Sequence, residues 1–162
     1  ELFNSPVFTD KYKTKELSSM DKIYDAIERA DLPVIFHSGY DCVSPDLIHS
    51  TPERALNMIK KHPKLKVILA HLGANMMWEQ VRDVLAGVDG EVYFDTAFTS
   101  MCPDELMQAI VEKHGADRIL FASDCPWDSS YLIKEKILRL NISEDNKDKI
   151  LGGNAERLLG LK

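Results

Sequence analysis

Short apolar runs alternate along this chain with longer segments whose apolar residues recur at helical spacing. The runs are nearly continuous in Val, Ile, Leu and Phe, which is typical of parallel strands buried on both faces. The segments between them place apolar residues three and four positions apart, as on one face of a helix. The pattern predicts strands at residues 34–37, 67–70, 92–94 and 119–123, and helices at residues 18–30, 51–63, 75–86, 103–114, 130–138, 143–151 and 154–159.

Capping residues indicate where several of these helices begin and end. Thr51 followed by Pro52 predicts a helix start, because the Thr oxygen caps free N–H groups and proline loses no hydrogen bond at the first position. The remaining caps are expected at Ser18–Ser19, Ser143 and Asn154, with Gly160 as a C-terminal stop. Residues 1–12 show no clear period and are expected to form a loop.

The order of elements predicts an α/β fold. One helix is followed by three strand–helix units, a fourth strand and a helical tail, which favours four parallel strands covered by helices with right-handed crossovers. A complete eight-stranded barrel takes about 250 residues, and this chain has 162. We therefore expect residues 1–162 to form a single domain that is half of a (β/α)8 TIM barrel. The chain begins at Glu1 rather than Met, which agrees with a piece of something longer.

Three of the expected strands end in a residue that can bind a metal: His37, His71 and Asp124. Parallel β/α folds place functional groups at the carboxyl ends of strands, so these side chains are expected to converge. Imidazole nitrogen and carboxylate oxygen suit zinc and similar divalent ions. A lone histidine at a strand end is more often a satisfied core or loop residue, and Asp124 could cap a turn, but the set of three favours a site.

Strand alternation extends this prediction below the site. If the metal-binding residues face the barrel interior, so do the residues two and four positions before them. Asp95 ends the remaining strand in the same way. The inward-facing apolar residues are then expected to be Ile35, Val67, Leu69, Tyr93, Leu120 and Ala122.

Composition excludes several other classes. The net charge is −6 and no basic cluster occurs, which argues against nucleic acid or acidic membranes as partners. No apolar run approaches the roughly 20 residues that span a bilayer. The three cysteines, Cys42, Cys102 and Cys125, are odd in number and lack Cys-x-x-Cys spacing, so a reducing cytoplasm is expected.

Four motifs together resemble the second half of the amidohydrolase superfamily, in its amidohydrolase-related, decarboxylase-like branch. They are His37-Ser-Gly39, Leu69-Ala-His71-Leu-Gly73, Phe121-Ala-Ser-Asp124-Cys-Pro-Trp127 and Gly153-Asn-Ala-Glu-Arg-Leu-Leu159. The resemblance implies the C-terminal half of the barrel, strands five to eight. It assigns metal binding to His37 and Asp124. His71 is implied as a proton shuttle or electrophile in one-metal members, and as a ligand in two-metal members. The family's His-x-His pair on strand one has no counterpart here.

These observations together predict a metal-dependent hydrolase whose metal-activated water attacks an amide, ester or lactone, or a related non-oxidative decarboxylase. Asp124 and His71 are the expected catalytic residues, His37, His71 and Asp124 the expected ligands of a divalent ion such as zinc, and Trp127 the expected contact for a small-molecule substrate. Because the inner face and two sheet edges would be open, we expect a homo-oligomer or association with the missing N-terminal half. The alternative is a non-catalytic half-barrel scaffold or assembly subunit. A receiver or nucleotide-binding domain is disfavoured by the lack of a Gly-rich loop.

Overall fold

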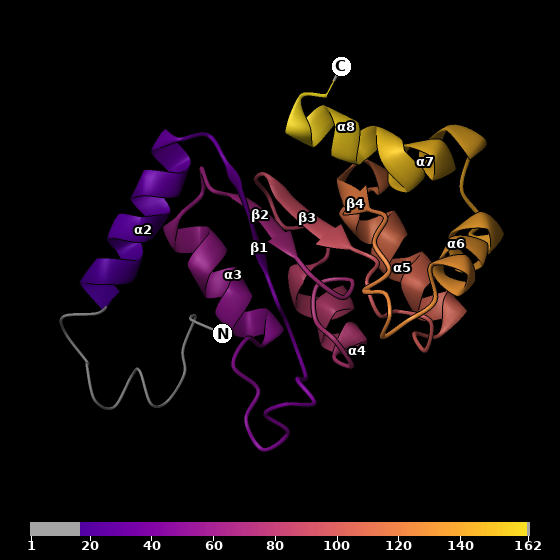
Figure 1. Ribbon diagram of the computed structural model, residues 1–162, viewed down its shortest axis with the longest axis horizontal. Helices are drawn as coiled ribbons and strands as arrows, with labels where there is room; N and C mark the ends of the chain where they lie inside the picture. Colours follow the sequence, from indigo (N-terminus) through magenta and orange to yellow (C-terminus); the bar gives the residue numbers. More distant parts are fainter. Residues whose placement is uncertain (1–16, 162) are drawn as a thin grey trace.

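Four parallel strands form one sheet in the order β1-β2-β3-β4 (Figure 1). The structure is a computed structural model that describes residues 17–161, so the loop expected at residues 1–12 lies outside the described residues. The strands are β1 (Pro33–Phe36), β2 (Lys66–Leu69), β3 (Val92–Asp95) and β4 (Ile119–Leu120). The α/β fold expected from the sequence is confirmed, with β1 and β4 at the two edges of the sheet.

Helices connect the strands and form a C-terminal tail beside β4 (Figure 1). No helix within residues 17–161 is long and apolar enough to cross a membrane. The helices are α2 (Leu17–Arg29), α3 (Pro52–Lys61), α4 (Trp78–Gln80), the π-helix η1 (Val81–Leu85), α5 (Asp104–His114), the 3-10 helix η2 (Ala116–Arg118), α6 (Ser130–Arg139), α7 (Glu144–Asp148), the π-helix η3 (Lys149–Gly153) and α8 (Asn154–Leu159).

Several expected helix ends are confirmed. The backbone N–H of Arg54 donates to the Thr51 hydroxyl at 3.4 Å, and Pro52 opens α3 as predicted. Ser143 accepts from the N–H of Asn146 at 3.2 Å and caps α7. Gly160 ends α8 in the left-handed conformation that glycine adopts readily. Ser18 and Ser19, in contrast, lie inside α2, so their assignment as caps is wrong.

The segment after β2 differs from its prediction. The helix expected from residue 75 begins at Trp78. Asn75 cannot join it, because its N–H donates to the carbonyl of Ser38 at 2.7 Å and its own carbonyl accepts from Tyr40 at 3.0 Å. Both backbone groups therefore connect two loops rather than a helix.

The last strand and the C-terminal tail each differ from the prediction at one point. The strand expected over residues 119–123 ends at Leu120, because the N–H of Phe121 donates to the carbonyl of Ile150 in η3 at 3.0 Å. Asn154 is not a cap: it lies within a continuous helical run. Its buried amide donates to the carbonyls of Ala116 and Ile119 at 2.7 and 2.8 Å, which fixes the tail to β4.

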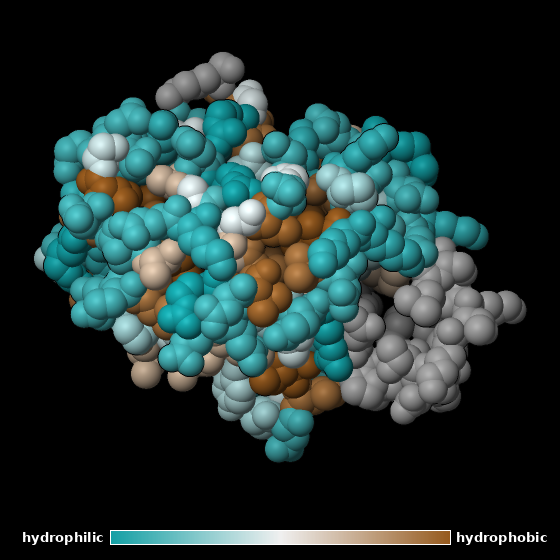
Figure 2. Space-filling view, turned by 180° about the vertical axis from the view of Figure 1, so that it is seen from behind, coloured by the Kyte–Doolittle hydropathy of each residue, from teal (hydrophilic) through white to brown (hydrophobic). Residues whose placement is uncertain are grey.

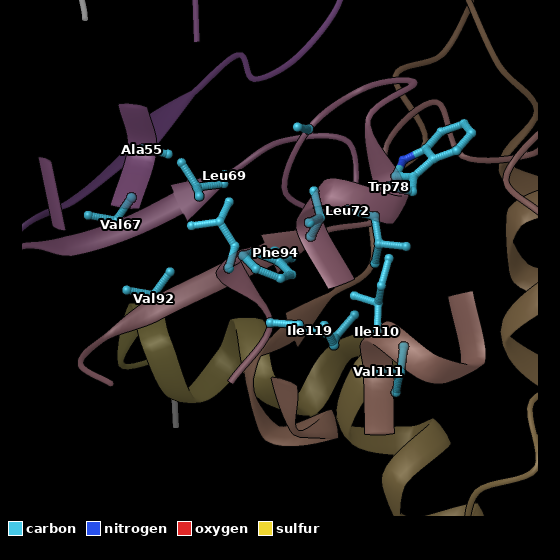
Figure 3. Packing of buried hydrophobic residues seen from close by; sticks show 14 of the residues in the cluster. Ala55, Val67, Leu69, Leu72, Trp78, Val92, Phe94, Ile110, Val111 and Ile119 are labelled. Carbon is cyan, nitrogen blue, oxygen red and sulfur yellow. The ribbon is translucent and has the colours of Figure 1, made fainter. Parts of the chain in front are cut away.

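The hydrophobic core lies on one face of the sheet, under α3, η1 and α5. From the strands it takes Val67, Leu69, Val92, Phe94 and Ile119, which Figure 3 shows with Ala55 of α3 and with Ile110 and Val111 of α5. Each of the strand residues is at most 1% exposed. Burial of such side chains typically contributes about 1.5–3 kcal/mol each, so this layer provides much of the fold's stability.

The residues on the opposite face of the sheet differ from those expected to point inward. Ile35 pairs in register with Ile68, and Ile68 with Tyr93, so these three side chains share a face. Val67 and Leu69 therefore lie on the helix-covered face, and their prediction as inward residues is wrong. The strict alternation assumed for them breaks after β2, where the backbone enters the left-handed region.

The sequence predicts that this inner face of the sheet is open, but only part of it is exposed. Ile35 is 62% exposed, whereas Tyr93 and Leu120 are buried. The Tyr93 hydroxyl donates to Glu91 and lies beside Arg157 of α8, and η3 and α8 contact β4, so the helical tail reaches this part of the sheet. Figure 2 shows apolar surface across the middle of the molecule seen from behind, with a polar border. Some apolar surface thus remains uncovered by the described chain.

His114 is a structural histidine at the end of α5. Its ring stacks on Phe94 with centroids 3.8 Å apart and an interplanar angle of 11°. Nε2 donates to the carbonyl of Val92 at 3.0 Å, and Nδ1 accepts the N–H of Gly87 at 3.3 Å. Burial, and secondarily the charge of Arg118, lowers the pKa of His114 to about 3. The folded protein therefore holds this ring neutral.

We expect the neutral state of His114 to make the fold sensitive to acid. Its folded pKa of about 3 lies below the ordinary value of 6.5. Below pH 6.5 the unfolded chain takes up a proton that the folded chain does not, so stability falls with decreasing pH until about pH 3. At about 1.4 kcal/mol per pH unit, roughly 2 kcal/mol is lost between pH 7 and pH 5.

Urea unfolding of the protein and of His114→Gln, at a series of pH values, measures this contribution. The variant removes the titrating ring, so the difference in unfolding free energy between the two proteins should shrink as pH falls. A difference that stays constant from pH 7 to pH 5 would show that His114 is not held neutral.

Candidate functional site

Two of the predicted ligands meet at the carboxyl edge of the sheet. His37 directly follows β1 and His71 lies two residues beyond β2, on the neighbouring strand. Nε2 of His71 is 3.0 Å from Nδ1 of His37, and the two rings meet edge to face with centroids 4.8 Å apart. His71 is buried and His37 is half-buried. The structure therefore joins these imidazoles directly.

A backbone carbonyl determines which ring nitrogens of the pair carry protons. Nδ1 of His71 is 3.0 Å from the carbonyl oxygen of Ala97, which can only accept, so Nδ1 carries the proton. In a neutral ring the other nitrogen, Nε2, is then an acceptor, and Nδ1 of His37 must donate to it. The remaining nitrogen, Nε2 of His37, keeps its lone pair.

That remaining atom has the properties of a metal ligand. Nε2 of His37 is buried and finds no hydrogen-bond partner among the described residues. Burial, followed by the nearby His71 ring, lowers the pKa of His37, while Asp41 opposes the shift. A neutral imidazole whose second nitrogen is held by another group is the usual form of a metal-binding histidine. His37 therefore fits a divalent ion.

A left-handed turn directs the His71 ring towards His37. His71 and Leu72 have φ values of 63° and 56°, which cost non-glycine residues roughly 1–2 kcal/mol each. Their N–H groups donate to the Oδ1 and the backbone carbonyl of Asp95, at 3.0 and 2.6 Å. The indole N–H of Trp78 donates to the carbonyl of His71 at 3.0 Å. These bonds offset the strain of the turn.

Asp95, the last residue of β3, lies beneath this turn and is 4% exposed. Burial raises the pKa of Asp95 above its ordinary range. The N–H groups of His71 and Ala97 oppose that shift, and the negative charge of Asp124 adds to it. Asp124 follows β4, the strand that pairs with β3, so Asp95 and Asp124 lie at the same edge of the sheet.

The third predicted ligand, Asp124, lies on the loop after β4. It is exposed, has a φ of 61°, and its carbonyl accepts the N–H of Trp127 at 2.8 Å. The loop approaches the segment after β3, where the N–H of Phe98 donates to the carbonyl of Ser123 at 3.4 Å. The side chain of Trp127 is 77% exposed. The substrate contact expected for Trp127 stays a prediction.

No three histidine, cysteine, aspartate or glutamate side chains within residues 17–161 are arranged to hold a metal by themselves. The structure brings together His37 and His71 but leaves Asp124 on an exposed loop. The assignment of all three as ligands therefore stays a prediction, and a complete coordination shell needs groups from elsewhere.

Gly39 connects the loops that carry the two histidines. Its N–H donates to the carbonyl of Ser50 at 2.8 Å, and its backbone also forms a parallel bridge with Asn75. The Asn75 side chain donates to the carbonyl of Tyr40 at 2.9 Å. The loop after His37 is thus tied to the loop after His71 by several backbone bonds, which limits the movement of both rings.

Sequence reasoning noted Asp95 at a strand end but gave it no role, and it missed Ala97 and Asn75. The position of Asp95, directly after an apolar run, is the same signal that identified His37. Ala97 acts through its carbonyl oxygen, which every residue has, so no feature of its side chain could have indicated the role.

A parallel β/α sheet with linked imidazoles at its carboxyl edge defines a protein of the β/α-barrel class, where functional groups lie on the loops at that edge. A family model described as amidohydrolase matches residues 3–161. The chain therefore belongs to the amidohydrolase family, as its motifs suggested.

Similar proteins agree with this family. A gamma-resorcylate decarboxylase from Polaromonas sp. (strain JS666 / ATCC BAA-500) is 28% identical over 131 residues, which cover 70% of this chain and 40% of that protein. A dihydroxybenzoic acid decarboxylase structure from Polaromonas sp. JS666, with bound manganese and the inhibitor 2-nitroresorcinol, has a TM-score of 0.63 at 20% identity, over 86% of this chain and 53% of that one. An uncharacterized TIM-barrel protein from Bordetella bronchiseptica has a TM-score of 0.65 at 23% identity, over 87% of this chain and 50% of that one.

The chain thus spans about half, or less, of the length of these similar proteins. Its four strands and their helices are a partial TIM barrel, which confirms the predicted fold class.

Proposed function

We propose that this chain contributes strands five to eight, as one domain, to the barrel of a metal-dependent enzyme that decarboxylates a hydroxylated aromatic acid without an oxidant. The family match supports the class of enzyme. The 28% identity with gamma-resorcylate decarboxylase favours decarboxylation over hydrolysis. By analogy with that relative, the substrate is then a small carboxylic acid.

The observation that carries this proposal is the buried Nε2 of His37, which has no hydrogen-bond partner within residues 17–161. Buried polar atoms nearly always have a partner in folded proteins. A buried, unprotonated lone pair at a strand end, without a partner in the described part of the chain, is explained by a ligand that the atom binds. His37 and Asp124 would hold a divalent ion, and the imidazole and carboxylate suit zinc or manganese.

His71, and Asp124 in addition to its role as a ligand, would hold and move protons. His71 keeps its Nδ1 proton on the carbonyl of Ala97 and offers Nε2 on the side of His37. Asp124, exposed at the mouth, is available to exchange a proton with a substrate, and Trp127 to contact an aromatic ring. A bound divalent ion would supply positive charge that holds a carboxylate or activates water.

A decarboxylation assay tests the proposal on the protein as its gene encodes it. With γ-resorcylate, the substrate named by the relative, we expect CO2 release that chelation abolishes and added Zn²⁺ or Mn²⁺ restores. A protein that binds no metal and releases no CO2 would contradict the enzyme and favour the scaffold alternative. Metal-dependent cleavage of amides, esters or lactones without CO2 release would contradict decarboxylation and support hydrolysis.

A further inference from the structure

One carboxylate oxygen holds two separate parts of the histidine network. Oδ1 of Asp95 accepts the backbone N–H of His71 and the backbone N–H of Ala97, each at 3.0 Å. Asp95 is 4% exposed, so these bonds form away from water. Two buried N–H groups without acceptors would cost about 1–3 kcal/mol each. The folded protein therefore strongly favours the geometry in which Oδ1 of Asp95 accepts both.

Both bonds act on the same imidazole. The first holds the main chain of His71 in its left-handed turn. The second orients the segment whose carbonyl, that of Ala97, accepts the Nδ1 proton of His71 at 3.0 Å. The backbone nitrogen and the ring of His71 are thus both anchored to residues 95–97, and Asp95 is the side chain common to the two anchors.

The consequence reaches the candidate metal ligand. With its Nδ1 proton on Ala97, His71 presents Nε2 as an acceptor, and His37 donates its Nδ1 proton to it at 3.0 Å. If the Ala97 carbonyl moved away, His71 could carry its proton on Nε2 instead. That nitrogen would then need an acceptor, and His37 would have to place its own proton on Nε2, the atom that faces the candidate ion.

We propose that Asp95 is a positioning residue that fixes the tautomers of His71 and His37 and so keeps Nε2 of His37 unprotonated. Asp95 touches neither ring directly in this role; it acts through the peptide groups of His71 and Ala97. The effect on metal binding rests on the proposed function, whereas the tautomer assignment does not.

Three substitutions separate the geometry of the carboxylate from its charge. Asp95→Asn keeps an oxygen of the same reach that accepts both N–H groups. Asp95→Ala removes the acceptor, and Asp95→Glu keeps the charge but moves the oxygens by one methylene. Asp83→Asn is the matched control, because Asp83 is exposed and its side-chain hydrogen bonds within residues 17–161 go to the neighbouring Arg82.

Imidazole ¹⁵N NMR of the metal-free protein at pH 8 measures the tautomers directly. We expect the wild type, Asp95→Asn and Asp83→Asn to carry protons on Nδ1 of both His71 and His37. We expect Asp95→Ala and Asp95→Glu to show a mixture of tautomers at both rings. If Asp95→Ala does not fold, Asp95→Glu makes the same comparison, and the wild-type spectrum is informative by itself.

Either of two results would overturn the proposal: a wild-type His71 protonated on Nε2, or a folded Asp95→Ala or Asp95→Glu protein with unchanged tautomers. Metal titration of the same proteins then tests the consequence, for which we expect about 10–100-fold weaker binding in Asp95→Ala. Altered tautomers with no metal binding in any protein, the wild type included, would support the positioning role and contradict the proposed function.

Discussion

The His37→Ala variant is expected to lose nearly all bound metal and nearly all turnover. The substitution removes the buried Nε2 that has no partner among the described residues, and it also removes the donor to Nε2 of His71. Loss of one ligand from a site of three or four protein ligands leaves too few for stable binding. Metal analysis of the purified protein, together with the decarboxylation assay, measures both effects.

Two further variants give this experiment its contrast. His62→Ala should keep its metal, because His62 lies at the end of α3 and pairs with Asp21 at 3.1 Å. His71→Ala should reduce turnover more than metal content if His71 handles a proton rather than binding the ion. Full metal occupancy with wild-type turnover in His37→Ala would eliminate His37 as a ligand.

The Gly39→Ala variant is expected to be the most destabilising single-methyl substitution in the site. Gly39 has a φ of 88°, and an added Cβ would overlap the backbone nitrogen and oxygen of Asn75 and lie 2.7 Å from the carbonyl carbon of Ala74. Left-handed strain costs about 1–2 kcal/mol and overpacking about 1–3 kcal/mol. The sum, roughly 2–5 kcal/mol, is a large part of a typical stability of about 5–15 kcal/mol.

Urea unfolding compares this variant with Gly152→Ala. Gly152 lies in η3, has no positive φ and has no atom within 4 Å of an added Cβ, so alanine there should be neutral or slightly stabilising. Because the Gly39 backbone joins the loops after β1 and β2, we also expect Gly39→Ala to weaken metal binding through displacement of His37. Equal stabilities for the two variants would show that the loops are not packed as described.

The strands could be predicted from the sequence because each is a short apolar run that leads to a His or an Asp. Their parallel arrangement followed from the alternation with helices. The face of each strand residue could not be predicted as safely. Alternation was counted backwards from His71, but the left-handed residues His71 and Leu72 break the period, so Val67 and Leu69 were assigned to the wrong face.

The candidate site shows a similar division. The meeting of His37 and His71 could be predicted, since both follow apolar runs that become neighbouring strands. The roles of Asp95 and Ala97 depend on backbone N–H and C=O groups brought together from two loops. Tertiary contacts of this kind leave no periodic signal in the chain, and a backbone carbonyl has no sequence identity at all.

The most direct test of the account is the position of a bound ion in a crystal of the protein grown with Mn²⁺. Anomalous scattering locates manganese independently of any assumed ligand. The account predicts one peak within bonding distance of Nε2 of His37, with Asp124 turned towards it and the His37–His71 hydrogen bond retained. A protein that binds Mn²⁺ elsewhere, with Nε2 of His37 paired to a protein group, would contradict it.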